Sequence, residues 1–92
     1  MSKPNQVKSV VFSAPHGWGK TRNKAALQNA LGCVGVVDDW RPGMRGEPGA
    51  LHLTTATPDD LTRWPGSTDQ NVVIVTSGWT HTADEYFKVM QA

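Results

Sequence analysis

The sequence predicts an α/β fold, a three-layer sandwich built on a small, mostly parallel sheet of about four strands. Two observations lead to this prediction. Short apolar segments typical of buried strands recur along the chain, and segments with helical spacing or helix-start residues separate most of them. The chain has 92 residues, which is enough for one small hydrophobic core. We therefore expect a single domain over residues 1–92, with residues 1–6 disordered.

The first half of the chain predicts two strands and one helix. Residues 7–12 are rich in β-branched and aromatic residues, as in a strand covered on both faces. Residues 20–31 carry apolar side chains at helical spacing, and Gly32 stands where a left-handed cap would end that helix. Residues 34–37 predict the second strand. Residues 41–49 hold two Pro and three Gly, so we expect a loop there.

The second half predicts two more strands, each followed by a helix. Residues 51–55 predict the third strand. Residues 57–60 begin a short helix, with Thr as the N-cap, Pro at the first helical position and two acids in the first turn, and the Pro-Gly pair at 65–66 stops it. Residues 71–76 predict a fourth strand of the buried, two-sided kind. Residues 82–85 form a capping box for a last helix.

Composition limits the classes of protein to consider. No apolar stretch is long enough for a membrane span or a signal peptide, so we expect a cytoplasmic protein without a membrane partner. The single cysteine, Cys33, excludes an internal disulfide and is expected in the core. The net charge is only +1, but the basic residues gather in the first half. That excess suits a polyphosphate ligand and is too small to argue for nucleic acid.

The segment with the clearest chemical meaning lies between the first strand and the first helix. It reads Ala-Pro-His-Gly-Trp-Gly-Lys-Thr over residues 14–21 and fits the Walker A pattern, with alanine in place of the first glycine. In such a loop the backbone N–H groups converge on a phosphate, and the following helix adds its positive dipole end. The candidate nucleotide-binding residues are Ala14, Pro15, His16, Gly17, Trp18, Gly19, Lys20 and Thr21.

The Walker A pattern predicts a specific role for two residues of this loop. Lys20 would reach the β- and γ-phosphates, and the Thr21 hydroxyl would help to hold Mg²⁺. The alternative is an ordinary glycine-rich turn with a solvated lysine. Trp18 could cover a nucleotide base, although packing of its side chain on its own domain is the simpler interpretation.

A second motif follows the second strand. The apolar residues 34–37 end in Asp38 and Asp39, the form of a Walker B motif. Asp38 would hold Mg²⁺, usually through water, together with Thr21. Asp39 takes the place where many ATPases have a glutamate that orients the attacking water, so Lys20 and Asp39 are the catalytic candidates. The alternative is a pair of acids at the exit of a strand.

With these motifs the chain resembles the P-loop NTPases, and more narrowly the additional-strand group that includes AAA-type ATPases. The resemblance covers residues 14–21, 34–39 and 51–61. It implies a truncated P-loop NTPase core in which Thr54 or Thr55 senses the γ-phosphate and residues 72–76 form the final strand, beside the phosphate-loop strand. Very short proteins of this kind are also similar to small P-loop proteins of phage and prophage genomes.

The chain departs from that family in three respects. Only about 18 residues separate Lys20 from Asp38, so the strand and helix that normally intervene are missing. The helical lid domain of AAA proteins is missing as well. No arginine can be assigned as a finger, although Arg41, Arg45 and Arg63 are available.

Three functions remain as hypotheses. The first is binding of a nucleoside triphosphate, ATP foremost, with Mg²⁺ and with slow hydrolysis, in a protein that assembles with itself or with a host protein. The second is a non-hydrolysing regulatory module that acts on a protein or nucleic-acid partner. The third is a small nucleotide kinase whose phosphoryl acceptor lies near Asp38 and Asp39.

The remaining aromatic and histidine residues carry weaker predictions. Trp40 and Trp79 follow strand ends, where ligands bind in α/β sheets, so either could contact a base, with packing against the domain as the alternative. His52 alternates with two leucines and is expected on the surface. His81 is interpreted as part of a helix start. The histidines and the cysteine show no metal-ligand spacing, so we expect no zinc site.

Overall fold

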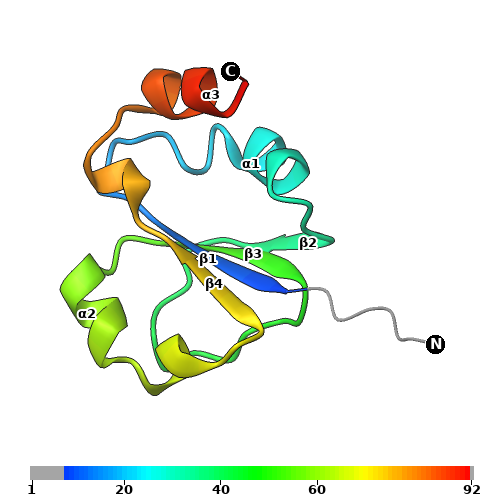
Figure 1. The fold of residues 1–92 in the computed structure, drawn as a ribbon, viewed down its shortest axis with the longest axis vertical. Helices are drawn as coiled ribbons and strands as arrows, with labels where there is room; N and C mark the ends of the chain where they lie inside the picture. The colour runs from blue at the N-terminus through cyan, green and yellow to red at the C-terminus, as the bar shows by residue number, and fades with distance from the viewer. Residues whose placement is uncertain (1–7, 92) are drawn as a thin grey trace.

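The computed structural model describes residues 8–91 of the chain. The elements follow one another as β1 (Ser9–Ser13), α1 (Lys24–Ala30), β2 (Gly35–Val37), β3 (Ala50–Thr54), α2 (Pro58–Arg63), the 3₁₀ turn η1 (Pro65–Thr68), β4 (Val72–Val75), the 3₁₀ turn η2 (Ser77–Trp79) and α3 (Ala83–Gln91) (Figure 1). The expected disorder of residues 1–6 and the expected start of the first strand at residue 7 lie outside the described residues.

The four strands form one sheet in the order β2-β3-β1-β4, and every neighbouring pair is parallel. This confirms the α/β fold with a small parallel sheet. β4 pairs with β1, as expected for the final strand. Because all the strands run the same way, their carboxyl ends meet along one edge of the sheet, on the left in Figure 1. Parallel α/β sheets bind their ligands at this edge.

Helices cover both faces of the sheet. Helices α1 and α3 lie over one face and α2 over the other (Figure 1). Side chains alternate along β1: Val10 and Phe12 belong to the core under α1 and α3, whereas Val11 belongs to the smaller core on the side of α2, with Trp40 and Leu61. The predicted three-layer arrangement is therefore present at this coarse level.

The connection between β2 and β3 contains no helix, as the Pro and Gly residues predicted. It lies on the side of α2, where it places Trp40 against His52 at a ring-centroid distance of 5.4 Å. The expectation that His52 is a surface residue is wrong, because its side chain is only 2% exposed. Its Nδ1 bonds to the Val10 carbonyl at 3.2 Å, and its Nε2 accepts the Glu47 N–H at 3.0 Å. These bonds fit the neutral Nδ1–H tautomer.

The fourth strand is less buried than its apolar sequence predicted. Val72–Val75 lies at an edge of the sheet, and Val73 is 39% exposed. The expectation of a two-sided, buried strand is therefore wrong. The composition of a short apolar strand does not distinguish a central position from an edge, because that depends on how many neighbours the topology supplies.

Two predicted helix starts are confirmed. At α2 the Thr57 hydroxyl accepts the Asp60 N–H and the Asp60 carboxylate accepts the Thr57 N–H. At α3 the Thr82 and Glu85 side chains accept each other's backbone N–H groups, at 3.2 and 2.9 Å. Both boxes depend only on nearby residues, which is why the sequence shows them.

Helix α1 begins later than residues 20–31 predicted. It starts at Lys24 and has seven residues. The Asn23 side chain explains the delay, because its Nδ2 donates to the Gly19 carbonyl at 2.9 Å, where the Asn23 backbone N–H also donates. Such a side-chain bond to a nearby carbonyl favours a turn over a regular helix. Within the described residues, no helix has the length and apolar character needed to cross a membrane.

Candidate functional site

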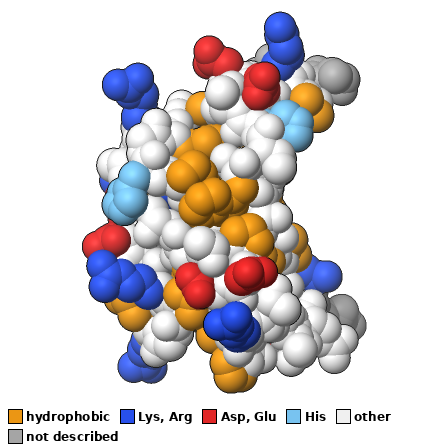
Figure 2. Space-filling model, turned by 90° about the vertical axis from the view of Figure 1, so that its left-hand side faces the viewer, with side chains coloured by type: hydrophobic (Ala, Val, Ile, Leu, Met, Phe, Trp, Pro, Cys, Tyr) orange, Lys and Arg blue, Asp and Glu red, His pale blue; other side chains and the backbone are white. Residues whose placement is uncertain are grey.

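A cleft of about 860 Å³ opens at the carboxyl edge of the sheet. We call it the phosphate-loop cleft, after the predicted phosphate-binding loop at residues 14–21, most of which lines it together with the predicted acidic pair. Its lining comprises residues 16–23, the Asp38–Asp39 pair, residues 53–55 from the end of β3, and Ala83 and Asp84 from the start of α3. Figure 2 looks onto this edge from outside: apolar side chains gather along the middle of the face, and Lys and Arg side chains lie around its margins.

The loop itself leaves β1 at Ala14, whose side chain is fully buried. Gly17 and Gly19 adopt φ values of +84° and +99°, which L side chains rarely adopt. Both positions therefore require glycine for the loop to take this path. The sequence placed these two glycines correctly as the points where the backbone changes direction.

The backbone N–H groups of the loop are mostly free. Within the described part of the chain, the N–H groups of Gly17, Gly19, Lys20 and Thr21 have no acceptor. The Trp18 N–H is an exception, since it donates to the Pro15 carbonyl at 3.2 Å. Free N–H groups in a short glycine-containing loop are suited to binding an anion. The predicted support from a helix dipole is not present at Lys20, because α1 starts four residues further on.

Lys20 lies inside the cleft. Its Nζ donates to the Ala14 carbonyl at 2.7 Å and to the Pro15 carbonyl at 3.1 Å. An ammonium group has three N–H donors, so one is left for a ligand. Burial lowers the pKa of Lys20, and the charge of Asp38 opposes that shift. The solvated lysine of the ordinary-turn alternative does not describe this side chain.

Thr21 and Asp38 lie together, as the two motifs predicted. The Thr21 hydroxyl donates to the Asp38 carboxylate, with 3.2 Å to Oδ2 and 3.4 Å to Oδ1. A hydroxyl and a carboxylate are hard oxygen donors, the kind that Mg²⁺ prefers, and Mg²⁺ usually keeps several of its waters. The donor set therefore fits the expected ion.

Asp39 also lines the cleft, in an unusual backbone conformation. Its φ is +56°, and it is the one non-glycine residue of the described chain with a positive φ. Its N–H donates to Asp38 Oδ1 at 2.9 Å. Its own carboxylate has no hydrogen-bond partner among the described residues, so none of them orients it toward a water.

The two sensor candidates differ. Thr54 is 1% exposed, and its hydroxyl accepts the Ala56 N–H at 3.1 Å. Thr55 is half-buried and also lines the cleft, and its hydroxyl has no partner within the described residues. Of the pair, Thr55 is the one with a free hydroxyl to offer to a ligand.

Trp18 holds the loop against the rest of the domain. Its Nε1 donates to the His81 carbonyl at 2.8 Å. Its ring centroid lies 4.9 Å from that of Phe12 and 5.9 Å from that of Tyr86. This confirms the simpler interpretation, packing on its own domain. That Trp18 contacts α3 and the turn before it was not predictable from the sequence, because these segments are far from the loop along the chain.

The start of the loop is fixed by contacts that the sequence did not reveal. The Trp79 Nε1 donates to the Ser13 hydroxyl at 2.6 Å, and that hydroxyl donates to the Ala56 carbonyl. Gly78 packs so closely that a Cβ there would lie 2.6 Å from the Ala14 Cβ. These contacts join the ends of β1, β3 and β4 directly behind the loop.

Several other side chains differ from their predicted surroundings. Trp40 is 2% exposed and lies on the side of α2, away from the cleft, so it is not placed to contact a base there. Trp79 is half-buried and bonded to Ser13. Cys33 packs against the main core, as expected, and burial raises the pKa of its thiol. Arg22 and Asp84 line the cleft although the sequence analysis did not select them.

In comparisons with known proteins, no family model, no curated protein and no solved structure matches the chain.

Proposed function

We propose that this protein binds a nucleoside triphosphate, ATP foremost, together with Mg²⁺, through a truncated P-loop core. The observation that carries the proposal is the convergence of three features in one cleft. These are the free N–H groups of Gly17, Gly19 and Thr21, the Lys20 ammonium, and the Thr21–Asp38 pair. Each feature alone is common, whereas their convergence matches what a metal-bound polyphosphate requires.

The order of the strands supports the same proposal. The loop leaves the central strand β1, and the acids leave β2, with β3 between them. Asp38 nevertheless reaches Thr21, because the loop bends across the end of β3.

In this site the chain's own groups would act as follows. The N–H groups of residues 17, 19, 20 and 21 would bind phosphate oxygens, and Lys20 would turn from the Ala14 and Pro15 carbonyls to the phosphates. Thr21 and Asp38 would hold the metal ion. Mg²⁺, when bound, neutralises charge on the phosphates. Hydrolysis would be slow, because Asp39 is the residue available to place water and no protein group orients it.

A non-hydrolysing binding module is the second candidate function. The unoriented Asp39 carboxylate favours it, because a general base works when neighbouring groups hold it in place. Under this alternative the nucleotide binds with the same residues and stays intact. Measurement of phosphate release after binding is established separates the two candidates.

Calorimetric titration with ATP tests the proposal. We expect saturable binding in the presence of Mg²⁺, weaker binding in EDTA, and a loss of at least about tenfold in affinity for Lys20→Ala, since a charge-assisted hydrogen bond contributes roughly 1.5–3 kcal/mol. Lys24→Ala is the matched control, because Lys24 is exposed on α1 and does not line the cleft. Absence of ATP binding to the folded wild type, or equal binding by both variants, contradicts the proposal.

A further inference from the structure

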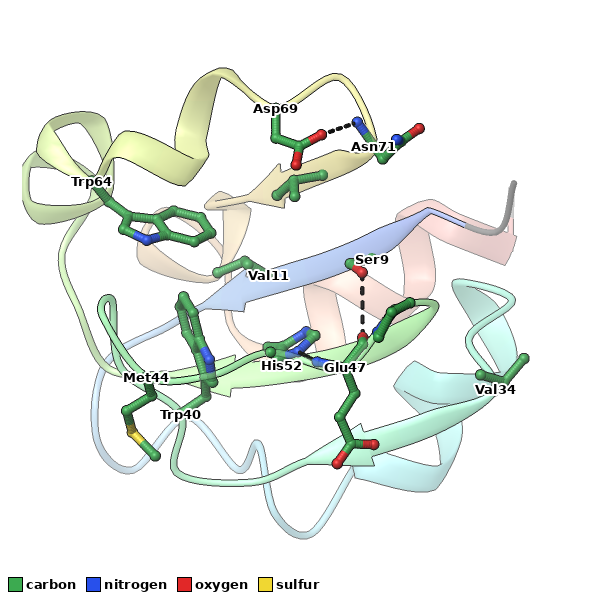
Figure 3. Close-up of a pocket in the computed structure, with 13 residues that line it drawn as sticks. Ser9, Val11, Val34, Trp40, Met44, Glu47, His52, Trp64, Asp69 and Asn71 are labelled. Carbon is green, nitrogen blue, oxygen red and sulfur yellow. Dashed lines mark hydrogen bonds between the residues drawn. The ribbon is translucent and has the colours of Figure 1, made fainter. Parts of the chain in front are cut away.

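A second cavity, of about 600 Å³, lies on the opposite side of the sheet from α1 and α3. Its floor is β1, with Ser9 and Val11, and it is bounded by the β2–β3 connection on one side and by the chain between α2 and β4 on the other (Figure 3). It shares no lining residue with the phosphate-loop cleft. Its volume is in the range of small-molecule sites.

The walls of this second cavity are largely apolar and aromatic. Trp40 and Trp64 reach toward each other from opposite sides, with ring centroids 5.0 Å apart and planes at 72°. Val11 and Val72 complete the apolar surface. Packing of each indole against the other restricts their movement, so the cavity has a fixed aromatic wall.

The polar groups that line the cavity are partly satisfied, and the Glu47 carboxylate and the Asn71 side-chain amide have no partner among the described residues. Both ring nitrogens of His52 are already bonded, to Val10 and Glu47. Asp69 Oδ1 accepts the Asn71 N–H at 2.8 Å, and its other carboxylate oxygen lies on the side of the cavity in Figure 3. No lysine or arginine is among the lining residues.

The aromatic wall also holds a polar atom that the protein does not satisfy. Trp40 Nε1 is buried and has no hydrogen-bond partner within the described residues. Buried N–H groups without an acceptor are uncommon in native proteins and call for an explanation. A water molecule beside Trp40 would supply the missing acceptor.

We propose that the second cavity binds a small, uncharged aromatic compound that carries an N–H donor, with the ring on the Trp64 and Val72 surface and the N–H directed to Asp69. Apolar walls favour a ring. The exposed carboxylate of Asp69 can accept an N–H from a ligand, and together with that of Glu47 it repels an anion, because no basic side chain lines the cavity to offset the repulsion. The proposal does not depend on the nucleotide function.

Indole and its isostere benzofuran, which lacks the N–H, provide the test. Binding to the full chain is followed by ¹H–¹⁵N NMR titration in the absence of nucleotide. We expect saturable shifts at the backbone amides of Ser9, His52 and Val72, and about threefold tighter binding of indole than of benzofuran, as for a hydrogen bond to an exposed carboxylate. Asp69→Ala should remove that preference and leave the affinity for benzofuran within about twofold.

Asp59→Ala is the control, because Asp59 is an exposed acid on α2 that does not line the cavity. It should keep the preference for indole, and the NMR spectrum of each variant reports whether it is folded. Three results would overturn the proposal: no saturable binding of either probe, equal affinity for both, or a preference that survives in folded Asp69→Ala.

Discussion

The Thr21 hydroxyl lies 3.2 Å from Asp38 Oδ2 and joins the phosphate loop to the end of β2. Both residues are exposed, so the bond contributes little to stability. Its importance lies in the placement of two oxygen donors side by side. Because they come from segments 17 residues apart in sequence, only the fold brings them together.

We expect Thr21→Val and Asp38→Asn each to reduce the Mg²⁺-dependent gain in ATP affinity by about tenfold or more, because a lost metal contact typically costs that much. The double variant should lose little beyond either single change, since both donors serve one ion. Titration calorimetry with and without Mg²⁺ measures the gain. Asp59→Asn, outside the cleft, should leave it unchanged, and full additivity of the two single effects would contradict a shared ion.

Gly78→Ala should destabilise the fold and disturb the start of the phosphate loop. The new Cβ would lie 2.6 Å from the Ala14 Cβ and 3.1 Å from the Ser13 carbonyl oxygen. Overpacking of this kind costs about 1–3 kcal/mol. Gly35→Ala is the control, because a Cβ there meets nothing within 4 Å, and alanine in a strand is slightly favoured over glycine. Urea unfolding measures both, and equal stabilities would show that the contact is not tight.

The sequence predicted features that depend on neighbouring residues. The capping boxes at Thr57 and Thr82 and the glycine turns of the loop are of this kind, because each is determined by residues within a few positions. The sequence also predicted the apolar centre of each strand, although most strand ends in the structure differ from the predicted ends by a residue or more. The structure places the Thr21 hydroxyl beside the Asp38 carboxylate, and their joint role in holding Mg²⁺ stays a prediction.

Features that depend on the three-dimensional arrangement were not predictable in this way. His52 was expected on the surface because it alternates with leucines, but the helix-free connection carries Trp40 and Glu47 over it. Val73 is partly exposed because β4 has one neighbouring strand. The second cavity also has no signal in the sequence, since its lining comes from segments far apart along the chain.

His52→Phe tests the buried histidine. Phenylalanine has a similar volume but would leave the Val10 carbonyl and the Glu47 N–H without their partner. The Glu47 N–H lies at an exposed residue and can bond to water, whereas a buried polar group that loses its partner costs about 1–3 kcal/mol, so we expect the free energy of unfolding to fall by about 1–3 kcal/mol. His16→Phe, at an exposed position of the loop, should change it by no more than about 0.5 kcal/mol. A similar effect of both changes would mean that the His52 bonds do not stabilise the fold.

The Cys33 thiol should react slowly and introduce a pH dependence of stability. Burial raises the pKa of this thiol above its ordinary value of 9.0. Above about pH 9 the unfolded chain therefore releases the proton more readily than the folded chain, and the wild type loses stability as the pH rises. Urea unfolding at pH 7.5 and 9.5 should show this loss relative to Cys33→Ala. Alkylation should be slower in the folded protein than in urea, and equal rates would contradict a buried thiol.

Substitutions at Asp39 test its backbone conformation and its proposed role in hydrolysis separately. Its φ of +56° is tolerated better by asparagine and glycine than by other residues. Asp39→Gly removes the side chain from this left-handed conformation but makes the unfolded chain more flexible, and because these two effects are of similar size we expect the free energy of unfolding to change by no more than about 0.5 kcal/mol. Asp39→Asn should leave both stability and ATP affinity nearly unchanged, because it keeps the shape of the side chain while it removes the charge.

Phosphate release then distinguishes the two candidate functions. If Asp39 places the attacking water, Asp39→Asn should bind ATP as the wild type does but lose the slow turnover. Asp38→Asn should instead lose the contribution of Mg²⁺ to ATP affinity. If the protein is a non-hydrolysing module, wild type and Asp39→Asn release no phosphate above the uncatalysed rate under conditions in which both are saturated with ATP. Turnover that is equal in wild type and Asp39→Asn would exclude Asp39 as the residue that orients water.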